Sequence, residues 1–228
     1  GDSALWRGTS GGAMKAMKAS ATDPKQLVDR ARDVSFALDR LLELNGEKEG
    51  VFSGKCDPAR IGMSGHSFGA ATTLAVSWQV FALAGIEKTL KDPRIKAALA
   101  FSAPAARKNN TERTYGAIKI PTFIMTGTLD NSPIGETSAP ERRIPYDGMK
   151  PPSKYLLIFE GGDHMVFSGQ PRRLGDSTRD KAIHSLIRQS SAAFWDAYLK
   201  GEDQAREWLS AGDFTKELAT NGVFEIKN

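Results

Sequence analysis

The chain has 228 residues, of which 40% are hydrophobic and 25% charged, the balance of a globular protein with a buried core. Its 31 basic and 27 acidic residues leave a net charge of +4 without a basic, aromatic-rich block, so nucleic-acid binding is not expected. No apolar run approaches the roughly 20 residues of a membrane span, and the length fits one α/β domain or a large all-β domain.

A loop and a long helix are predicted at the start of the chain. Residues 1–22 are rich in Gly, Ser, Ala and Lys, which is typical of a loop. Thr22 or Asp23 can cap the helix, Pro24 suits its first turn, and apolar residues then recur at helical spacing until Gly46. The pattern therefore predicts a helix with one apolar stripe.

A parallel sheet is predicted from four short apolar runs. They span residues 60–64, 94–104, 120–130 and 154–164. The runs are apolar on both faces, as strands are when helices cover both sides of a parallel sheet. After the first run, small apolar residues from Phe68 to about Ala84 predict a buried helix. These elements favour an α/β fold over an all-β fold.

The remaining elements complete a single domain over residues 1–228. Residues 131–152 carry several prolines and charges and are expected to form a loop or a small cap insertion. Helices are predicted over residues 178–200 and 203–209. We find neither an internal repeat nor a low-complexity segment, so nothing in the sequence divides the chain further.

No metal or cofactor is expected. His, Cys and carboxylate residues do not recur at the spacing of metal ligands, and no glycine motif of the phosphate-binding type is present. The single cysteine, Cys56, excludes an intrachain disulfide and lacks the context of a nucleophile. We expect it to be an unreactive free thiol.

The most informative motif is the pentapeptide GHSFG at residues 65–69, which has the pattern G-x-S-x-G. This pattern marks a sharp turn between a strand and a helix that presents a serine nucleophile. The predicted strand ends just before the motif, and the predicted helix follows it. Ser67 is therefore a candidate nucleophile, and the backbone N–H of Phe68 is a candidate donor to an oxyanion.

A serine hydroxyl needs a base, and the base needs an acid that orients it. The expected chain order is Ser, then Asp or Glu, then His. Asp130 and His164 follow in this order, each at the end of its own predicted strand. Because the carboxyl ends of parallel strands meet at one edge of the sheet, we expect Ser67, Asp130 and His164 to be the catalytic residues.

Other residues compete for these roles. His66 adjoins the nucleophile but should point away from it, and His184 lies on the last long helix as a surface or interface residue. Asp163 adjoins His164 and more simply fixes the loop, while Asp176 and Asp180 lie in a charged, solvated stretch. We also expect residues that adjoin the catalytic strand ends to line a substrate pocket, with ordinary packing as their alternative role: His66, Ser102, Met165, Val166 and Phe167.

Three segments resemble a known superfamily. The stretches RIGMSGHSFGAATTLA, PTFIMTGTLDNSP and KYLLIFEGGDHMVFSG are similar to α/β-hydrolases. More narrowly, they resemble bacterial predicted dienelactone hydrolases, which are related to the platelet-activating-factor acetylhydrolases. Since Ser67 stands where dienelactone hydrolases have a cysteine, the resemblance implies a serine carboxylesterase that acts on a small-molecule or lipid-like ester.

The resemblance also implies that this chain is N-terminally incomplete. The opening GDSALWRG resembles the segment after the fourth strand of the usual sheet. The earlier strands, and the loop that supplies a second oxyanion donor, are then expected from a second chain, a cleaved piece or a partner protomer. Without them, the strand before Ser67 would have an exposed edge.

Ester hydrolysis is not the only activity that such residues support. An amidase, a thioesterase or a polyester hydrolase uses the same three residues, because the shape of the pocket decides among acyl substrates. A binding protein without catalytic activity is the alternative from another class, since one oxyanion donor is missing.

Overall fold

The computed structural model describes residues 23–83, 86–106, 110–134, 137–169 and 178–228, together with positions 12, 15, 18 and 19. A five-stranded sheet forms the centre, in the order β1-β4-β5-β6-β7. The strands are β1 (Ile61–His66), β4 (Ile95–Phe101), β5 (Thr122–Leu129), β6 (Lys154–Asp163) and β7 (Gly222–Lys227). The first four are parallel and β7 is antiparallel to β6, so the predicted α/β fold and its four strands are confirmed.

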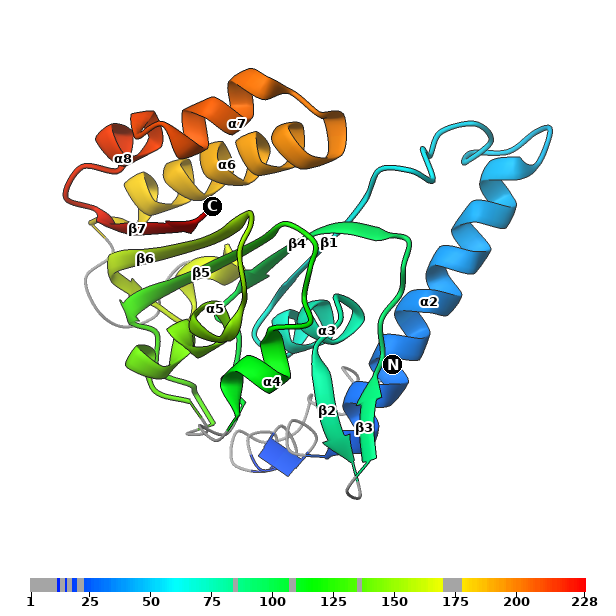
Figure 1. Ribbon diagram of the computed structural model, residues 1–228, viewed down its shortest axis with the longest axis horizontal. Coiled ribbons are helices and arrows are strands. Elements are labelled where there is room, and N and C mark those ends of the chain that lie inside the picture. The colour runs from blue at the N-terminus through cyan, green and yellow to red at the C-terminus, as the bar shows by residue number, and fades with distance from the viewer. Residues whose placement is uncertain are drawn as a thin grey trace.

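Helices cover both faces of the sheet (Figure 1). One face carries α3 (Phe68–Val76), α4 (Thr111–Tyr115) and α5 (Ile144–Gly148). The other face carries α6 (Asp180–Trp195), its continuation η4 (Asp196–Lys200), α7 (Asp203–Ser210) and α8 (Asp213–Leu218). The sheet therefore has the middle position of a three-layer domain, and in the described part of the chain no helix is both long and apolar enough to cross a bilayer.

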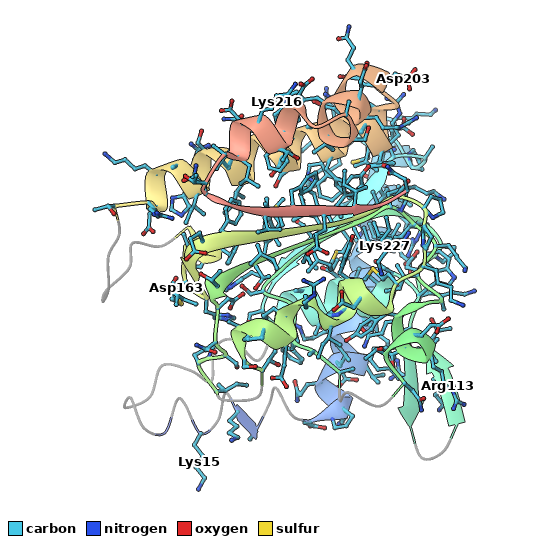
Figure 2. All side chains as sticks on the ribbon, turned by 60° about the vertical axis from the view of Figure 1, so that its left-hand side comes forward. Lys15, Arg113, Asp163, Asp203, Lys216 and Lys227 are labelled. Atoms are coloured by element: carbon cyan, nitrogen blue, oxygen red, sulfur yellow. The ribbon has the colours of Figure 1, made fainter. Side chains whose placement is uncertain are left out.

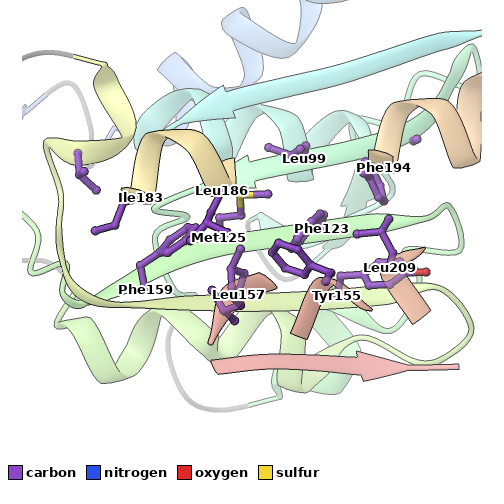
Figure 3. Close-up of a cluster of buried hydrophobic side chains, with 14 residues drawn as sticks. Leu99, Phe123, Met125, Tyr155, Leu157, Phe159, Ile183, Leu186, Phe194 and Leu209 are labelled. Carbon is purple, nitrogen blue, oxygen red and sulfur yellow. The ribbon is translucent and has the colours of Figure 1, made fainter. Parts of the chain in front are cut away.

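The alternation of side chains along each strand divides the core between these two faces. Phe123 and Met125 on β5 pack toward α6, whereas Ile124 packs toward α3 and α5. Figure 3 shows the larger cluster, in which aromatic rings from the strands meet Phe194 of α6. The ring centroids of Phe123 and Phe194 are 5.6 Å apart in an edge-to-face arrangement, which contributes about 0.5–1.5 kcal/mol beyond the buried area.

Two short helical turns follow strand ends near Ser67, and of these the sequence predicted a loop or cap element only for the first. Within residues 131–152, the structure has a 3₁₀ turn, η2 (Ala139–Arg143), which leads directly into α5. After β6, a second short turn, η3 (Val166–Ser168), turns the chain back toward α6. Both follow strand ends on the side of the sheet where Ser67 lies, so they are placed to hold residues of a site.

The long helix α2 (Pro24–Gly46) begins and ends as predicted, with Asp23 as its cap. Its attachment to the domain is partly ionic. Arg94 donates to Asp39 and to the backbone oxygen of Ser35 on α2, and also to Asp92 at the entrance to β4. Asp92 is buried and accepts a further hydrogen bond from the Ser35 hydroxyl. The ion pair therefore joins α2 to the sheet.

The free energy of unfolding at acidic pH should depend on Asp92. The hydrogen bonds from Arg94 lower the pKa of Asp92 to about 2, so its stabilising contribution is complete above its ordinary pKa of 3.8 and is lost as the pH falls toward about 2. We expect Asp92→Asn to be less stable than the native chain at neutral pH, with a difference that narrows below about pH 4. Urea unfolding across this range measures it, with the exposed Asp39→Asn as control. A difference that stays constant with pH would contradict the assignment.

The helix predicted from Phe68 to about Ala84 is wrong beyond Val76. A hairpin of β2 (Val80–Leu83) and β3 (Ile86–Thr89) follows instead. Trp78 has a positive φ of 79°, and the N–H of Gln79 donates to the Leu74 carbonyl, which together form a C-terminal cap. A cap of this kind usually uses glycine, so the sequence did not mark it.

Other differences lie at the two ends of the chain. Positions 12, 15, 18 and 19 are helical, so the loop predicted over residues 1–22 is wrong there; the surrounding Ala, Met and Lys residues are good helix formers. The rest of that loop lies outside the described residues. Helix α8 and strand β7 were not predicted. Strand β7 is short and half-buried, and it forms by pairing with β6.

Candidate active site

Ser67 occupies the sharp turn between β1 and α3. Its backbone is at φ 58° and ψ −117°, a conformation that non-glycine residues rarely adopt. The N–H of Ser67 donates to the carbonyl of Phe101 on β4, which holds the turn against the sheet. A Cβ atom on Gly65 would collide with the carbonyl of Gly69, so the first glycine of the motif is needed for close packing between strand and helix. The strain and the close packing are those of a nucleophile elbow.

His164 and Asp130 lie beside Ser67, as the sequence predicted. The Nε2 atom of His164 is 3.0 Å from the Ser67 Oγ, and its Nδ1 atom is 2.8 Å from an Asp130 carboxylate oxygen. Asp130 is fully buried, and its other oxygen accepts a hydrogen bond from the Thr126 hydroxyl at 2.8 Å. Figure 2 shows Asp163, which precedes His164 and ends β6, at the opposite end of the sheet from Lys227, which pairs with the start of β6. The site therefore lies at the carboxyl edge of the parallel strands.

The contacts among Ser67, His164 and Asp130 allow a proton to pass from the serine hydroxyl to the imidazole. An ionised Asp130 only accepts hydrogen bonds, so the proton of a neutral His164 lies on Nδ1. The lone pair of Nε2 then faces the hydroxyl of Ser67 and can accept its proton during attack on a carbonyl carbon. The arrangement is suited to acyl transfer through a serine.

His66 supports the loop that carries His164. Its Nε2–H group donates to the backbone carbonyl of His164 at 2.9 Å, and the two ring centroids are 4.7 Å apart. Burial lowers the pKa of His66, and the charge of a protonated His164 would lower it further. Both effects favour a neutral His66 imidazole, whose N–H group holds the loop that carries His164.

The competing residues hold the same loop. Asp163 accepts hydrogen bonds from the N–H groups of Met165 and Val166, both at 3.0 Å. His184, on α6, donates to the backbone carbonyl of Val166 at 2.9 Å. Asp180 is buried at the start of α6, so its assignment to a solvated stretch is wrong; Asp176 lies outside the described residues. Cys56 is a half-buried free thiol in the loop after α2.

The candidate pocket residues separate by exposure. Met165 is 45% exposed directly beside His164, and His66 is half-buried, so both present surface at the site. Val166 is 1% exposed and belongs to the core under α6, and Phe167 packs on that core against Phe101. Ser102 is fully buried. The structure therefore shows Val166 and Ser102 in a packing role. Phe167 is half-buried like His66, so its place in a substrate pocket stays a prediction.

The sequence did not identify Arg142, which the structure places against His164 and Asp130. It is 1% exposed and comes from η2, inside the segment expected to be a loop or a cap. Its guanidinium lies 3.4 Å from an Asp130 carboxylate oxygen and 3.3 Å from the Nδ1 atom of His164. Burial lowers the pKa of Arg142, which Asp130 opposes. The pair of arginines at residues 142–143 was the only sequence feature that could have indicated a buried cation here, but such a pair is equally typical of an exposed surface.

The described residues contain no cluster of side chains that could bind a metal ion. In residues 23–83, 86–106, 110–134, 137–169 and 178–228, no three His, Cys, Asp or Glu side chains gather as metal ligands would. The neighbours of His164 are a carboxylate, a hydroxyl, a guanidinium and a second imidazole, which suits proton transfer.

The fold is that of an α/β-hydrolase, with a mostly parallel sheet between helices and a serine at the turn after β1. The chain matches the model of a family described as PET hydrolase-like over residues 17–178, which is more than half of its length. It therefore belongs to that family, whose members are ester hydrolases. No curated protein matches the chain. The narrower resemblance to dienelactone hydrolases stays a prediction.

Proposed function

We propose that this protein is a serine ester hydrolase that forms an acyl-enzyme on Ser67. The observation that carries the proposal is the hydrogen-bonded chain from Ser67 through His164 to the buried Asp130. Each link has the length of a hydrogen bond and needs no rearrangement before the serine is deprotonated. Membership of an ester hydrolase family supports the same reaction.

The reaction follows from these contacts. The Ser67 Oγ attacks the ester carbonyl carbon while its proton passes to the Nε2 atom of His164. The resulting imidazolium is stabilised by Asp130 and then gives its proton to the leaving alcohol, so that an acyl group remains on Ser67. A water molecule, deprotonated by His164, attacks the acyl group and releases the acid and the free serine.

The tetrahedral oxyanion needs donors, and Phe68 supplies one. Phe68 is the first residue of α3, and the first N–H groups of a helix have no partner within the helix. Its N–H follows the nucleophile directly, which is the usual place of one oxyanion donor. We propose the Phe68 N–H for this role, helped by the partial positive charge at the start of α3.

The expectation that a second chain or protomer supplies further strands stays a prediction. It is supported by the position of β1, since β4 is the only described strand that pairs with it. A cavity of about 350 Å³ lies between α2 and the open side of β1, with Val34, Met63 and Ser64 in its lining. A strand edge that no described residue pairs with, beside a cavity, is where an additional strand would pair and bring a second oxyanion donor.

Polyesters are the second candidate substrate class, and the family description favours them over amides and thioesters. Met165 presents an exposed apolar surface beside His164, and Leu129, which precedes Asp130, is 56% exposed. Exposed apolar side chains next to the reacting atoms suit an ester that is held at a surface. A lipid-like ester has the same requirement, so the two classes need a direct comparison.

A substrate panel tests the proposed function. We expect turnover of a nitrophenyl butyrate ester, slower or no turnover of the matching anilide and thioester, and release of terephthalate from a terephthalate diester. A fluorophosphonate probe should label one residue per chain, and peptide mass spectrometry should place the label on Ser67. Absence of both labelling and ester turnover would contradict the proposal and leave the non-catalytic binding protein as the remaining interpretation.

A further inference from the structure

Arg142 is a charged side chain in an unusual place. With 1% exposure it is the largest fully buried side chain in the described part of the chain. Burial of a charge is costly unless hydrogen bonds and an opposite charge compensate for it. All the contacts that compensate here lead to the proposed active site.

Two of these contacts join the ends of neighbouring strands. The Nε–H group donates to the backbone carbonyl of Asp130 at 3.0 Å, after β5. One terminal N–H group donates to the backbone carbonyl of Ser102 at 2.7 Å, after β4. Ser102 has a positive φ of 51°, so this turn also needs support. A single guanidinium thus connects the loop that carries Asp130 to the strand next to β1.

The remaining contacts are electrostatic. The Nε atom lies 3.4 Å from the Asp130 carboxylate, and the other terminal nitrogen lies 3.3 Å from the Nδ1 atom of His164. Since Nδ1 donates its own proton to Asp130, it has no free lone pair for the guanidinium in this tautomer. The guanidinium therefore acts on His164 as a nearby positive charge, which favours an ionised carboxylate and a neutral imidazole.

Three groups that can carry a charge face His164. They are Asp130 after β5, Arg142 on η2 and the His66 ring at the end of β1. Asp163, the last residue of β6 and the neighbour of His164 in sequence, accepts hydrogen bonds from the N–H groups of the following turn. Within this set, Arg142 is the cation that contacts both the base and the acid.

We propose that Arg142 is a positioning residue, which fixes the Asp130 loop and holds a positive charge against both the acid and the base. The inference rests on the proposed serine hydrolase function. It assigns to the 139–143 turn a role in catalysis, whereas the sequence indicated only a cap or a loop.

Two variants separate hydrogen bonding from charge. Arg142→Gln removes the charge, and we expect kcat for a nitrophenyl ester to fall about 10- to 100-fold with little change in KM, because the carboxylate and imidazole are less well oriented. The acidic half-point of the kcat/KM profile should move upward by about one pH unit or more. Arg142→Lys keeps the charge and should keep the half-point, while kcat recovers only in part because a compact ammonium cannot reproduce the planar fork that reaches both the Asp130 and Ser102 carbonyls.

Arg143 provides the matched control. It adjoins Arg142, is partly exposed and pairs with Asp147 and Glu225 away from the site. We expect Arg143→Gln to change neither kcat nor the pH profile. If Arg142→Gln behaves like Arg143→Gln, or if Arg142→Lys shifts the acidic half-point as much as Arg142→Gln, the positioning role is overturned.

Titration of the His164 imidazole by NMR keeps the test independent of turnover. In Arg142→Gln it should become protonated at higher pH than in the native chain, whereas in Arg142→Lys it should not. If Arg142→Gln does not fold, Arg142→Lys decides, because native kcat in that variant would overturn the proposal. Failure of the native chain to label with fluorophosphonate would count against the proposed function, while the NMR titration would still decide on Arg142.

Discussion

Replacing Ser67 with alanine is expected to lower kcat for a nitrophenyl ester by about 10⁶-fold, the cost of losing the nucleophile in a serine hydrolase. Without the hydroxyl, no covalent acyl intermediate can form and the basic nitrogen of His164 has no proton to take. The fold should be unaffected, because the side chain of Ser67 contributes one hydrogen bond to His164 and alanine meets the same backbone strain.

Steady-state turnover and fluorophosphonate labelling measure this effect together. Ser64 provides the control, since it lies on β1, the strand that leads to Ser67, is exposed and takes no part in the proposed reaction. Ser64→Ala should keep native turnover and native labelling, and the circular dichroism spectra of both variants should match that of the native chain. Labelling that persists in Ser67→Ala would show that another residue is the nucleophile.

Replacing Asp130 with asparagine is expected to lower kcat by about 10⁴-fold, as removal of the corresponding carboxylate does in other serine hydrolases. The amide of asparagine can donate to the Nδ1 atom of His164, which moves the imidazole proton to Nε2. That tautomer presents a hydrogen atom instead of a lone pair to Ser67. The variant also leaves the buried charge of Arg142 without its carboxylate partner, so some loss of stability should accompany the loss of activity.

Asp163→Asn separates the two candidate acids. Asp163 caps the turn after His164 through the N–H groups of Met165 and Val166, so this variant should lose far less activity than Asp130→Asn. Thermal unfolding of both variants separates stability from catalysis. If Asp163→Asn is the more damaged of the two in kcat, the assignment of Asp130 as the acid is wrong.

Much of the fold could be predicted because its signals are local. Strands β4, β5 and β6 are largely buried on both faces, so each reads as a continuous apolar run between polar loops. Strand β1 is only half-buried, and its position was marked instead by the glycine motif that follows it. The elbow has its own signature, since only glycine at position 65 tolerates the approach of the helix. The expectation that Ser67, Asp130 and His164 lie together then needed only the rule that parallel strands end at one edge.

The elements that were missed depend on distant partners. Helix α3 ends at a cap in which Trp78 adopts a conformation usually left to glycine, so the apolar residues after it continued to look helical. Strand β7 has few buried residues of its own and is held by its ladder with β6. Asp180 lies in a charged stretch of sequence but is buried at the start of α6, because tertiary packing decides exposure.

The fold class could be predicted from the sequence, and so could three candidates for nucleophile, acid and base, because hydrophobic periodicity, glycine positions and strand ends are local features. The surroundings of these residues became visible in the tertiary structure. It showed that His66 supports the His164 loop through a backbone carbonyl, that Val166 belongs to the core, and that Arg142 lies against the acid and the base. The sequence does not distinguish a buried arginine from a surface arginine, because burial and charge pairing arise from segments far apart in the chain.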